Sequence, residues 1–389
     1  MHKSNKLVFI HARRFADGGT GLALRTRLAF EALTGACASA EKHLICSSGD
    51  AEAALAKRMG WNYHRIETFD RTHTAGARAI VRLAAFAGSP VSQNMRSLLL
   101  TMLGGADLST SAVAPLLQSI GKADVWLARS DLLHLASSVV PGSRVIVDSN
   151  DSVANLVGCY DPKSRVRKAA FRSLDAVVRD VQREELRLAG LCNRIIAISP
   201  EDRDYYSRSS CPSVILEESC VTTPAVMPPI APGWDVGFIG GSHFGSISAA
   251  ANFMRIARRS ALDKLRFAIA GSVCERLDMT RPRNVEFVGR VSSASAFLAS
   301  CRQVVFWSER ETGTSVKFQE AVLSGTTVLA NPSAARWSEA KPGRDYIECT
   351  SETSLDTHLQ GRTTIAPSPL RTTCVREKVH ERFRKLALD

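Results

Sequence analysis

Residues 303–330 read QVVFWSERETGTSVKFQEAVLSGTTVLA, and this stretch decides how the chain is expected to fold. It opens with an apolar run at 304–307, passes through a polar turn, shows a helical pattern from about Ser315, and ends in a second apolar run at 327–330. Strand, turn, helix and strand make up the repeating unit of a parallel α/β sheet. Its strands are apolar throughout because helices cover both faces of the sheet.

The same alternation of strands and helices recurs along most of the chain. Further apolar runs predict strands at 7–10, 43–46, 124–128, 144–148, 194–199, 235–240, 265–271 and 285–289. Helical stretches separate them, and the longest extends from about 165 to 191. Strands that alternate with helices indicate a doubly wound parallel sheet. The sequence therefore predicts an α/β fold with two Rossmann-like domains.

A proline-rich segment divides the chain. Four prolines fall within residues 224–232, and prolines so close together fit neither a helix interior nor a central strand. We therefore expect an N-terminal domain at 1–219, a linker at 220–234, a C-terminal domain at 235–370 and an amphipathic helix in 371–389. In doubly wound sheets ligands bind beyond the carboxyl ends of the strands, so we expect the two domains to face a cleft there.

The turn before the helix at 315 has the chemistry of an anion site. Gly313, Thr314 and Ser315 expose backbone amides where the helix has its positive end, and both features favour phosphate oxygens. Lys317 adds a point charge. Glu320 lies three residues further along on the same helix face, where its carboxylate can accept hydrogen bonds from the vicinal hydroxyls of a ribose. Together these groups fit a nucleoside diphosphate.

This motif resembles the signature of the GT-B glycosyltransferases of family 4, in particular the bacterial sugar transferases that build exopolysaccharides and surface glycans. That signature reads roughly Gly-x-Gly-x-x-x-Lys-x-x-Glu-Ala, followed by Gly and Val-Val. It is matched by Gly313, Lys317, Glu320, Ala321, Gly325 and Val328. Three strand-and-glycine turns at 236–240, 268–271 and 285–290 match the family in order and spacing. The resemblance is concentrated in 235–332 and extends more weakly into the first domain.

The resemblance implies an enzyme that moves a sugar from a nucleotide-sugar donor to a glycan or lipid-linked acceptor. It implies retention at the anomeric carbon, no metal, no cofactor beyond the nucleotide-sugar co-substrate, and a final helix that packs back across the domains. Lys317 and Glu320 would be the catalytic residues of the donor side. The implied donor-binding residues are Gly240, Gly241, Gly271, Arg290, Gly313, Thr314 and Ser315.

Two departures from the family pattern keep other functions open. Thr312 stands eight residues before Glu320, where many members have a glutamate, and residues 241–245 lack the Arg and Lys that many members use for the diphosphate. One alternative is a non-catalytic nucleotide-sugar-binding scaffold on the same fold. Another is a nucleotide-sugar 2-epimerase, which shares the architecture.

The first domain supplies the candidates for the acceptor side. Gly18 and Gly19 lie in the loop after the first predicted strand, and Asp148 and Asp151 follow a later one. Alternatively, these residues form turns and cap helices. His134 is the candidate for an acceptor-side base; alternatively, it is an ordinary histidine packed in the fold. The same two alternatives apply to His11.

Asp202 and Asp204 spell Asp-x-Asp, a pattern that holds a metal in another class of transferases. Their context indicates a helix start instead, because Ser199 is a good N-cap, Pro200 suits the first helical position, and acidic residues favour the positive end of a helix. No metal site is predicted.

Charge and composition restrict the partners and the location. The chain has 389 residues and a formal net charge of +12, which points to an anionic partner. The basic run at 163–172 fits attraction to anionic lipid as well as an ordinary solvated helix face. Nucleic acid is not expected, because no recognition module occurs and aromatic residues make up only 6%. Without a leader-like N-terminus or a long apolar span, we expect a cytoplasmic protein, with peripheral contact to the inner membrane face.

Overall fold

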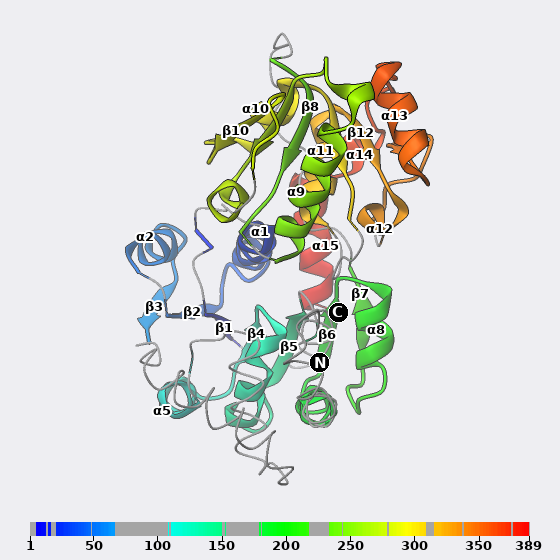
Figure 1. The fold of residues 1–389 in the computed structure, drawn as a ribbon. Helices are drawn as coiled ribbons and strands as arrows, with labels where there is room; N and C mark the ends of the chain where they lie inside the picture. Colours follow the sequence, from blue (N-terminus) through cyan, green and yellow to red (C-terminus); the bar gives the residue numbers. More distant parts are fainter. Residues whose placement is uncertain are drawn as a thin grey trace, which may run out of the picture. The chain divides into compact units, whose positions relative to one another are not determined.

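The chain divides into two units, each with its own parallel sheet (Figure 1). The computed structural model describes residues 5–12, 15–16, 21–47, 49–66, 108, 110–149, 152, 179, 181–217, 233–242, 244–277, 280–308, 315–336, 338–374 and 376–388. Unit 1 consists of Met1–Glu217 with Phe383–Asp389, and unit 2 of Glu218–Arg382. The expected linker prolines lie outside the described residues.

Unit 1 contains a seven-stranded sheet with the strand order β3-β2-β1-β4-β5-β6-β7. Its strands are β1 (Lys6–His11), β2 (Glu41–Cys46), β3 (Asn62–Arg65), β4 (Asp124–Leu127), β5 (Arg144–Ser149), β6 (Arg194–Ala197) and β7 (Val214–Leu216). The helices between them are α1 (Gly21–Ala36), α2 (Asp50–Arg58), α5 (Thr110–Ile120), a 3-10 helix at Ser130–Ser138, and α8 (Pro200–Tyr206). Residues 181–189 are also helical.

Unit 2 contains a six-stranded sheet with the order β10-β9-β8-β11-β12-β13. Its strands are β8 (Trp234–Ile239), β9 (Phe267–Ala270), β10 (Val285–Gly289), β11 (Cys301–Phe306), β12 (Thr327–Ala330) and β13 (Ile347–Glu348). Its α-helices are α9 (Phe244–Ala257), α10 (Ala294–Ala299), α11 (Val316–Ser324), α12 (Pro332–Ala335), α13 (Glu352–Gln360), α14 (Leu370–Thr373) and the start of α15 (Arg376–Leu388). Short 3-10 helices occupy Ser260–Leu262 and Ser272–Arg276.

The strand order confirms the predicted α/β fold class. All the strand pairs among the described residues are parallel, and each sheet reverses its direction of growth at its first strand, since β1 pairs with β2 and β4, and β8 pairs with β9 and β11. Such reversals create a crevice at the carboxyl ends of the strands, where doubly wound sheets bind ligands. The structure therefore directs attention to the residues that follow β1 in unit 1 and β8 and β11 in unit 2.

Aromatic packing holds α11 against the sheet of unit 2. Phe318 is fully buried on this helix, and its ring meets the ring of Phe306, the last residue of β11, edge to face at 6.0 Å. Phe306 in turn packs on Phe238 of β8. Because Phe318 is in the first turn of α11, this contact fixes where the helix begins.

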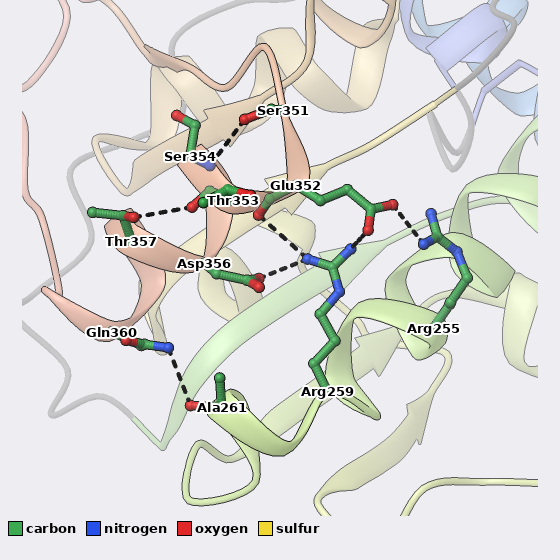
Figure 2. A network of polar contacts seen from close by, with 10 residues as sticks. All are labelled: Arg255, Arg259, Ala261, Ser351, Glu352, Thr353, Ser354, Asp356, Thr357 and Gln360. Carbon is green, nitrogen blue, oxygen red and sulfur yellow. Dashed lines mark hydrogen bonds and ion pairs between the residues drawn. The ribbon is translucent and has the colours of Figure 1, made fainter.

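A network of ion pairs joins α9 to α13 on the outside of unit 2 (Figure 2). Arg259 bonds the carboxylate of Glu352 and, at 2.7 Å, that of Asp356, while Arg255 reaches Glu352 at 2.5 Å. These bonds, from Arg255 on α9 and Arg259 just after it, lower the pKa of Glu352. Glu352 is in the first turn of α13, where a negative charge also suits the helix dipole.

The last helix, α15, passes from unit 2 into unit 1. Its residues from Phe383 onward group with unit 1, where the guanidinium of Arg25 lies 5.2 Å above the Phe383 ring and Arg194 donates to the Leu386 carbonyl at 2.5 Å. Among the described residues no helix has both the length and the apolar character needed to cross a membrane.

Candidate functional site

Three glycines form the carboxyl edge of the sheet at β8, β9 and β10. The N–H of Gly240 donates to the Ala270 carbonyl at 3.1 Å, and the N–H of Gly271 donates to the Gly289 carbonyl at 2.7 Å. Gly271 has a φ of 97°, and a Cβ there would lie 2.2 Å from the Gly240 carbonyl oxygen. Backbone thus replaces side chains along this edge, which lets a ligand approach main-chain groups closely. Gly241, the next residue after Gly240, is half-buried.

The start of α11 lies after β11 on the same edge of the sheet. Ser315 caps this helix, since its hydroxyl accepts a hydrogen bond from the Phe318 N–H at 3.4 Å. The predicted helix start is therefore confirmed. The other amide contributors expected from the sequence, Gly313 and Thr314, lie outside the described residues.

Lys317 and Glu320 are on one face of α11, as their spacing predicts. The Lys317 Nζ lies 2.5 Å from Glu320 Oε2. Their side chains keep 24% and 19% of their surface exposed, so both remain within reach of a ligand. This gives one cation in the first turn of the helix and one carboxylate in the next turn, the charge arrangement expected for a diphosphate beside a ribose.

Arg290, immediately after β10, pairs with a neighbouring carboxylate on the protein surface. It makes two hydrogen bonds to the carboxylate of Glu275, at 2.6 and 3.1 Å, and 71% of its side chain is exposed. These bonds raise the pKa of Arg290 and lower that of Glu275. A diphosphate would have to compete with Glu275 for this arginine, so its donor-binding role stays a prediction.

The acceptor-side expectation for Asp148 needs correction. Asp148 is fully buried at the end of β5, and Arg25 of α1 bonds its carboxylate with Nη2 at 2.7 Å and Nε at 3.0 Å. Arg25 is itself buried and also donates to the Glu217 carbonyl at 3.1 Å. The carboxylate therefore has a structural partner and no surface to offer an acceptor. Gly18, Gly19 and Asp151 lie outside the described residues.

The expectation of a base at His134 is corrected on similar grounds. The His134 side chain is buried, its Nδ1 lies 3.0 Å from the Asp131 carbonyl oxygen, and its Nε2 lies 3.0 Å from the Leu108 carbonyl oxygen. Burial lowers the pKa of this histidine. The ring is buried with both nitrogens against backbone carbonyl oxygens, which favours the packed-histidine interpretation over an acceptor-side base. His11, the other histidine considered, is also fully buried and packs against Phe15.

The Asp-x-Asp pair has the structural role that its context predicts. Ser199 caps α8 by accepting from the Asp202 N–H, and Pro200 is in the first turn. The Asp202 carboxylate accepts from the Ser199 hydroxyl at 2.8 Å and from the Ser152 N–H at 3.0 Å, while exposed Asp204 pairs with Arg203. In the parts of the chain that the structure describes, no three His, Cys, Asp or Glu side chains gather as a metal site would require.

Asn331, immediately after β12, is a residue of this edge that sequence reasoning missed. Its Nδ2 donates to the Ser308 carbonyl at 2.7 Å, and its Oδ1 accepts from the Ser308 N–H at 3.2 Å. The dipeptide Asn331-Pro332 signals a helix cap in the sequence, but it gives no sign of the contact with Ser308.

Comparison with known proteins finds one family to which part of the chain is similar. Residues 235–353 match the model of the family described as glycosyl transferases group 1. No curated protein sequence matches the chain significantly. The likeness to this family therefore lies within the second unit.

Solved structures extend the likeness to the whole chain. TarM of S. aureus has a TM-score of 0.60 at 9% identity, over 98% of this chain and 95% of that one. HepE of Anabaena, solved in complex with UDP, has a TM-score of 0.58 at 11% identity over 98% of both chains. The lipopolysaccharide outer core galactosyltransferase WaaB has a TM-score of 0.57 at 11% identity over 98% of both chains. This chain therefore has the GT-B glycosyltransferase fold; its assignment to family 4 stays a prediction.

Proposed function

We propose that this protein is a glycosyltransferase that moves a sugar from a nucleotide-sugar to a glycan or lipid-linked acceptor. The observation that carries the proposal is the pair Lys317 and Glu320, which share one accessible face of α11 just after its capped start, inside the stretch that matches the glycosyl transferases group 1 family. Binding of UDP by HepE, a neighbour in fold, supports UDP-sugars as the first donors to test.

In this proposal the start of α11 stabilises the leaving diphosphate. The capped start of α11 at Ser315 and the ammonium group of Lys317 stabilise the negative charge that develops as the sugar departs, and such electrostatic stabilisation contributes several kcal/mol to lowering a barrier. Glu320 accepts hydrogen bonds from the ribose hydroxyls. Because Lys317 and Glu320 bond each other in the structure, the nucleotide must separate or bridge them when it binds.

The remaining parts of the proposal are the stereochemistry and the partners. Transfer proceeds with retention, without a metal and without a cofactor other than the nucleotide-sugar. The acceptor is a glycan or a lipid-linked sugar, reached from the cytoplasmic side by peripheral contact with anionic lipid. A strongly basic chain, with a net charge of +12, supports such contact.

Donor turnover tests the proposal directly. The protein is incubated with UDP-, ADP- and GDP-sugars, with and without vesicles of anionic phospholipid, and release of nucleoside diphosphate is followed. Release above the blank is expected, and EDTA should not abolish it. Binding without release would instead indicate the scaffold, and interconversion of sugars the 2-epimerase. The anomeric configuration of the product, read by proton NMR, tests retention.

Substitution of Glu320 tests the site. Glu320→Ala should weaken binding of the accepted nucleotide by about 1.5–3 kcal/mol, roughly 10- to 150-fold, because charge-assisted hydrogen bonds to the ribose are lost. The control is Glu286→Ala. Glu286 bonds the Trp234 indole at 3.0 Å near the amino ends of β10 and β8, so its loss should leave affinity unchanged. Calorimetry that finds equal affinity for Glu320→Ala and wild type would remove Glu320 from the site.

A further inference from the structure

The amino-terminal edge of the sheet in unit 2 carries a group of exposed cations. They lie on two segments that lead into neighbouring strands, residues 257–266 between the end of α9 and β9, and residues 280–284 before β10. We call this group the basic cluster. Its members, all of them exposed, are Arg258, Lys264, Arg266, Arg281 and Arg283.

Direct bonds hold the two segments side by side. Nη2 of Arg258, at the end of α9, donates to the Thr280 carbonyl. From the second segment, Nδ2 of Asn284 donates to the Ala257 carbonyl at 3.0 Å and to the Leu262 carbonyl at 3.3 Å. The five cations therefore belong to one surface.

The charge of the basic cluster is not neutralised inside the protein. In the parts of the chain that the structure describes, none of its members forms an ion pair. Arg258 and Arg266 donate to backbone carbonyls, which leaves their charge in place. Arg259 of the same segment differs, because it pairs with carboxylates of α13. Asp263 is the one acidic residue of the two segments.

The other acids near this edge do not offset the cluster. Asp235, at the start of β8, accepts from the Arg266 N–H at 3.0 Å, but it also lies 3.8 Å from Arg302 and 3.8 Å from Arg362. Glu286 bonds the indole of Trp234. Cations thus outnumber acids along this edge, and the edge attracts an anionic partner.

The composition of the two segments favours lipid headgroups over other polyanions. They contain no aromatic residue on which a nucleic-acid base could stack. Leu262 and Leu265 are buried, and neither segment exposes a large apolar side chain of the kind that anchors a protein interface. A bilayer with anionic headgroups needs neither feature, because exposed Lys and Arg suffice to attract it.

We infer that the basic cluster docks this protein on anionic phospholipid. The inference rests on the proposed function, which includes contact with anionic lipid, and deepens it by naming the surface that makes the contact. The basic run at 163–172, the other candidate for this role, lies outside the described residues.

Docking at this edge leaves the proposed nucleotide site of unit 2 accessible. The basic cluster precedes β9 and β10, whereas the glycine edge and the start of α11 follow the carboxyl ends of the strands. In a parallel sheet these are opposite edges, and ligands bind at the carboxyl one. Headgroups and nucleotide should therefore bind together, without displacing each other.

Binding of the full chain to phospholipid vesicles tests the inference. Vesicles of phosphatidylcholine, with and without phosphatidylglycerol, are sedimented with the protein, and the affinity is derived from the bound fraction. Arg281→Gln/Arg283→Gln should bind the anionic vesicles about 25-fold more weakly than wild type, because each cation near an anionic membrane strengthens binding about fivefold.

A double variant in unit 1 is the matched control. Lys57 and Arg58, at the end of α2, are exposed and form no ion pair with any described residue. Lys57→Gln/Arg58→Gln therefore removes the same charge from another surface and should bind the vesicles as wild type does. The control separates a local docking surface from attraction by the total net charge of +12. Thermal unfolding confirms that both variants are folded.

Three outcomes would overturn the inference: wild type that does not bind anionic vesicles, an unchanged affinity of Arg281→Gln/Arg283→Gln, or an equal loss in Lys57→Gln/Arg58→Gln. Calorimetric titration with UDP, ADP and GDP keeps the proposed function separate. Wild type and Arg281→Gln/Arg283→Gln should bind the accepted nucleotide equally, with or without vesicles. A protein that binds nucleotide but no vesicles would refute the docking surface alone, and one that binds vesicles but no nucleotide would refute the proposed glycosyl transfer.

Discussion

At the carboxyl edges of the two sheets, the charged residues that the structure describes differ in how far they are exposed. In unit 1 these side chains are buried and bonded to one another, as in the pair of Asp148 with Arg25. In unit 2 the edge is glycine backbone, and its charged residues Lys317 and Glu320 keep part of their surface exposed. The difference teaches that a polar residue at the end of a strand is a candidate for ligand binding only while its side chain keeps exposed surface.

A second cluster in unit 1 shows the same use of polar groups. The Glu185 carboxylate accepts from the hydroxyls of Tyr206 at 2.7 Å and Tyr205 at 3.0 Å, and the Ser149 hydroxyl reaches Tyr206 at 3.4 Å. Burial and the charge of Glu185 raise the pKa of both tyrosines. Both hydroxyls therefore stay protonated and donate to the carboxylate, which makes this cluster a structural support of β5 and α8.

The largest effect that tests this comparison comes from breaking the buried ion pair. Asp148→Asn leaves the Arg25 charge without its counter-ion inside unit 1, so the free energy of unfolding of this unit should fall by about 3–5 kcal/mol. Nucleotide affinity of the folded protein should not change. Urea unfolding, followed by hydrogen exchange of peptides from each unit, measures the loss where it occurs.

Asp204→Asn is the control for that experiment. Asp204 pairs with Arg203 on the surface, with 70% of its side chain exposed, and an exposed pair contributes at most about 1 kcal/mol. A stable Asp148→Asn variant that lost nucleotide affinity would contradict the structural role of Asp148. It would show that this buried carboxylate contributes to nucleotide binding.

An intermediate effect is expected from adding one methyl group to the glycine edge of unit 2. Gly271→Ala combines a positive φ with a Cβ 2.2 Å from the Gly240 carbonyl oxygen, and we expect it to cost about 3 kcal/mol of stability, from backbone strain and overpacking together. Gly289→Ala, with a φ of 77° and no atom within 4 Å of the new Cβ, should cost only about 1 kcal/mol. Equal losses in thermal unfolding would show that strain alone, and not the close approach of two backbones, shapes this edge.

Much of the fold could be predicted because buried parallel strands are apolar throughout. Each strand expected from such a run is present, and the strands that were missed, β3, β7 and β13, lie at the edges of their sheets. The sequence of β3 is NYHR, and β13 has only two residues. An edge strand pairs on one side only, so the residues of β3 need not be apolar. The strand β7 is apolar (VIL), but like β13 it is too short, at three residues, to give a periodic signal.

The candidate site could be predicted only where its geometry is local. Lys317 and Glu320 share a face because they are three residues apart on one helix. Asp148 was misread because its partner, Arg25, is 123 residues away in the sequence, and no local pattern reveals such a pairing. Asn331 was missed for the same reason, since Ser308 is 23 residues away.

The smallest expected effect is a difference between the units in their response to acid. His43 on β2 and His64 on β3 lie in unit 1 with Nδ1 of the first 3.0 Å from Nε2 of the second. Burial lowers the pKa of both histidines; Glu41 opposes this at His43, whereas Lys6 adds to it. Two protonated rings would direct like charges and donors at each other, so the folded pair favours the neutral state.

The sign of the pH dependence follows from these lowered pKa values. In the unfolded chain histidines take up protons near pH 6.5, whereas in folded unit 1 His43 and His64 do so only at lower pH. Their contribution to stability is therefore complete above about pH 6.5 and is lost as the pH falls through the folded pKa values. Hydrogen exchange between pH 7.5 and 5.5, corrected for the intrinsic rate, should show unit 1 losing more stability than unit 2. His134, buried in the same unit with a lowered pKa, contributes in the same direction. His64→Gln removes one of the two titrating groups of the pair and should reduce this difference; a slope identical to that of wild type would mean that the pair does not set the acid response.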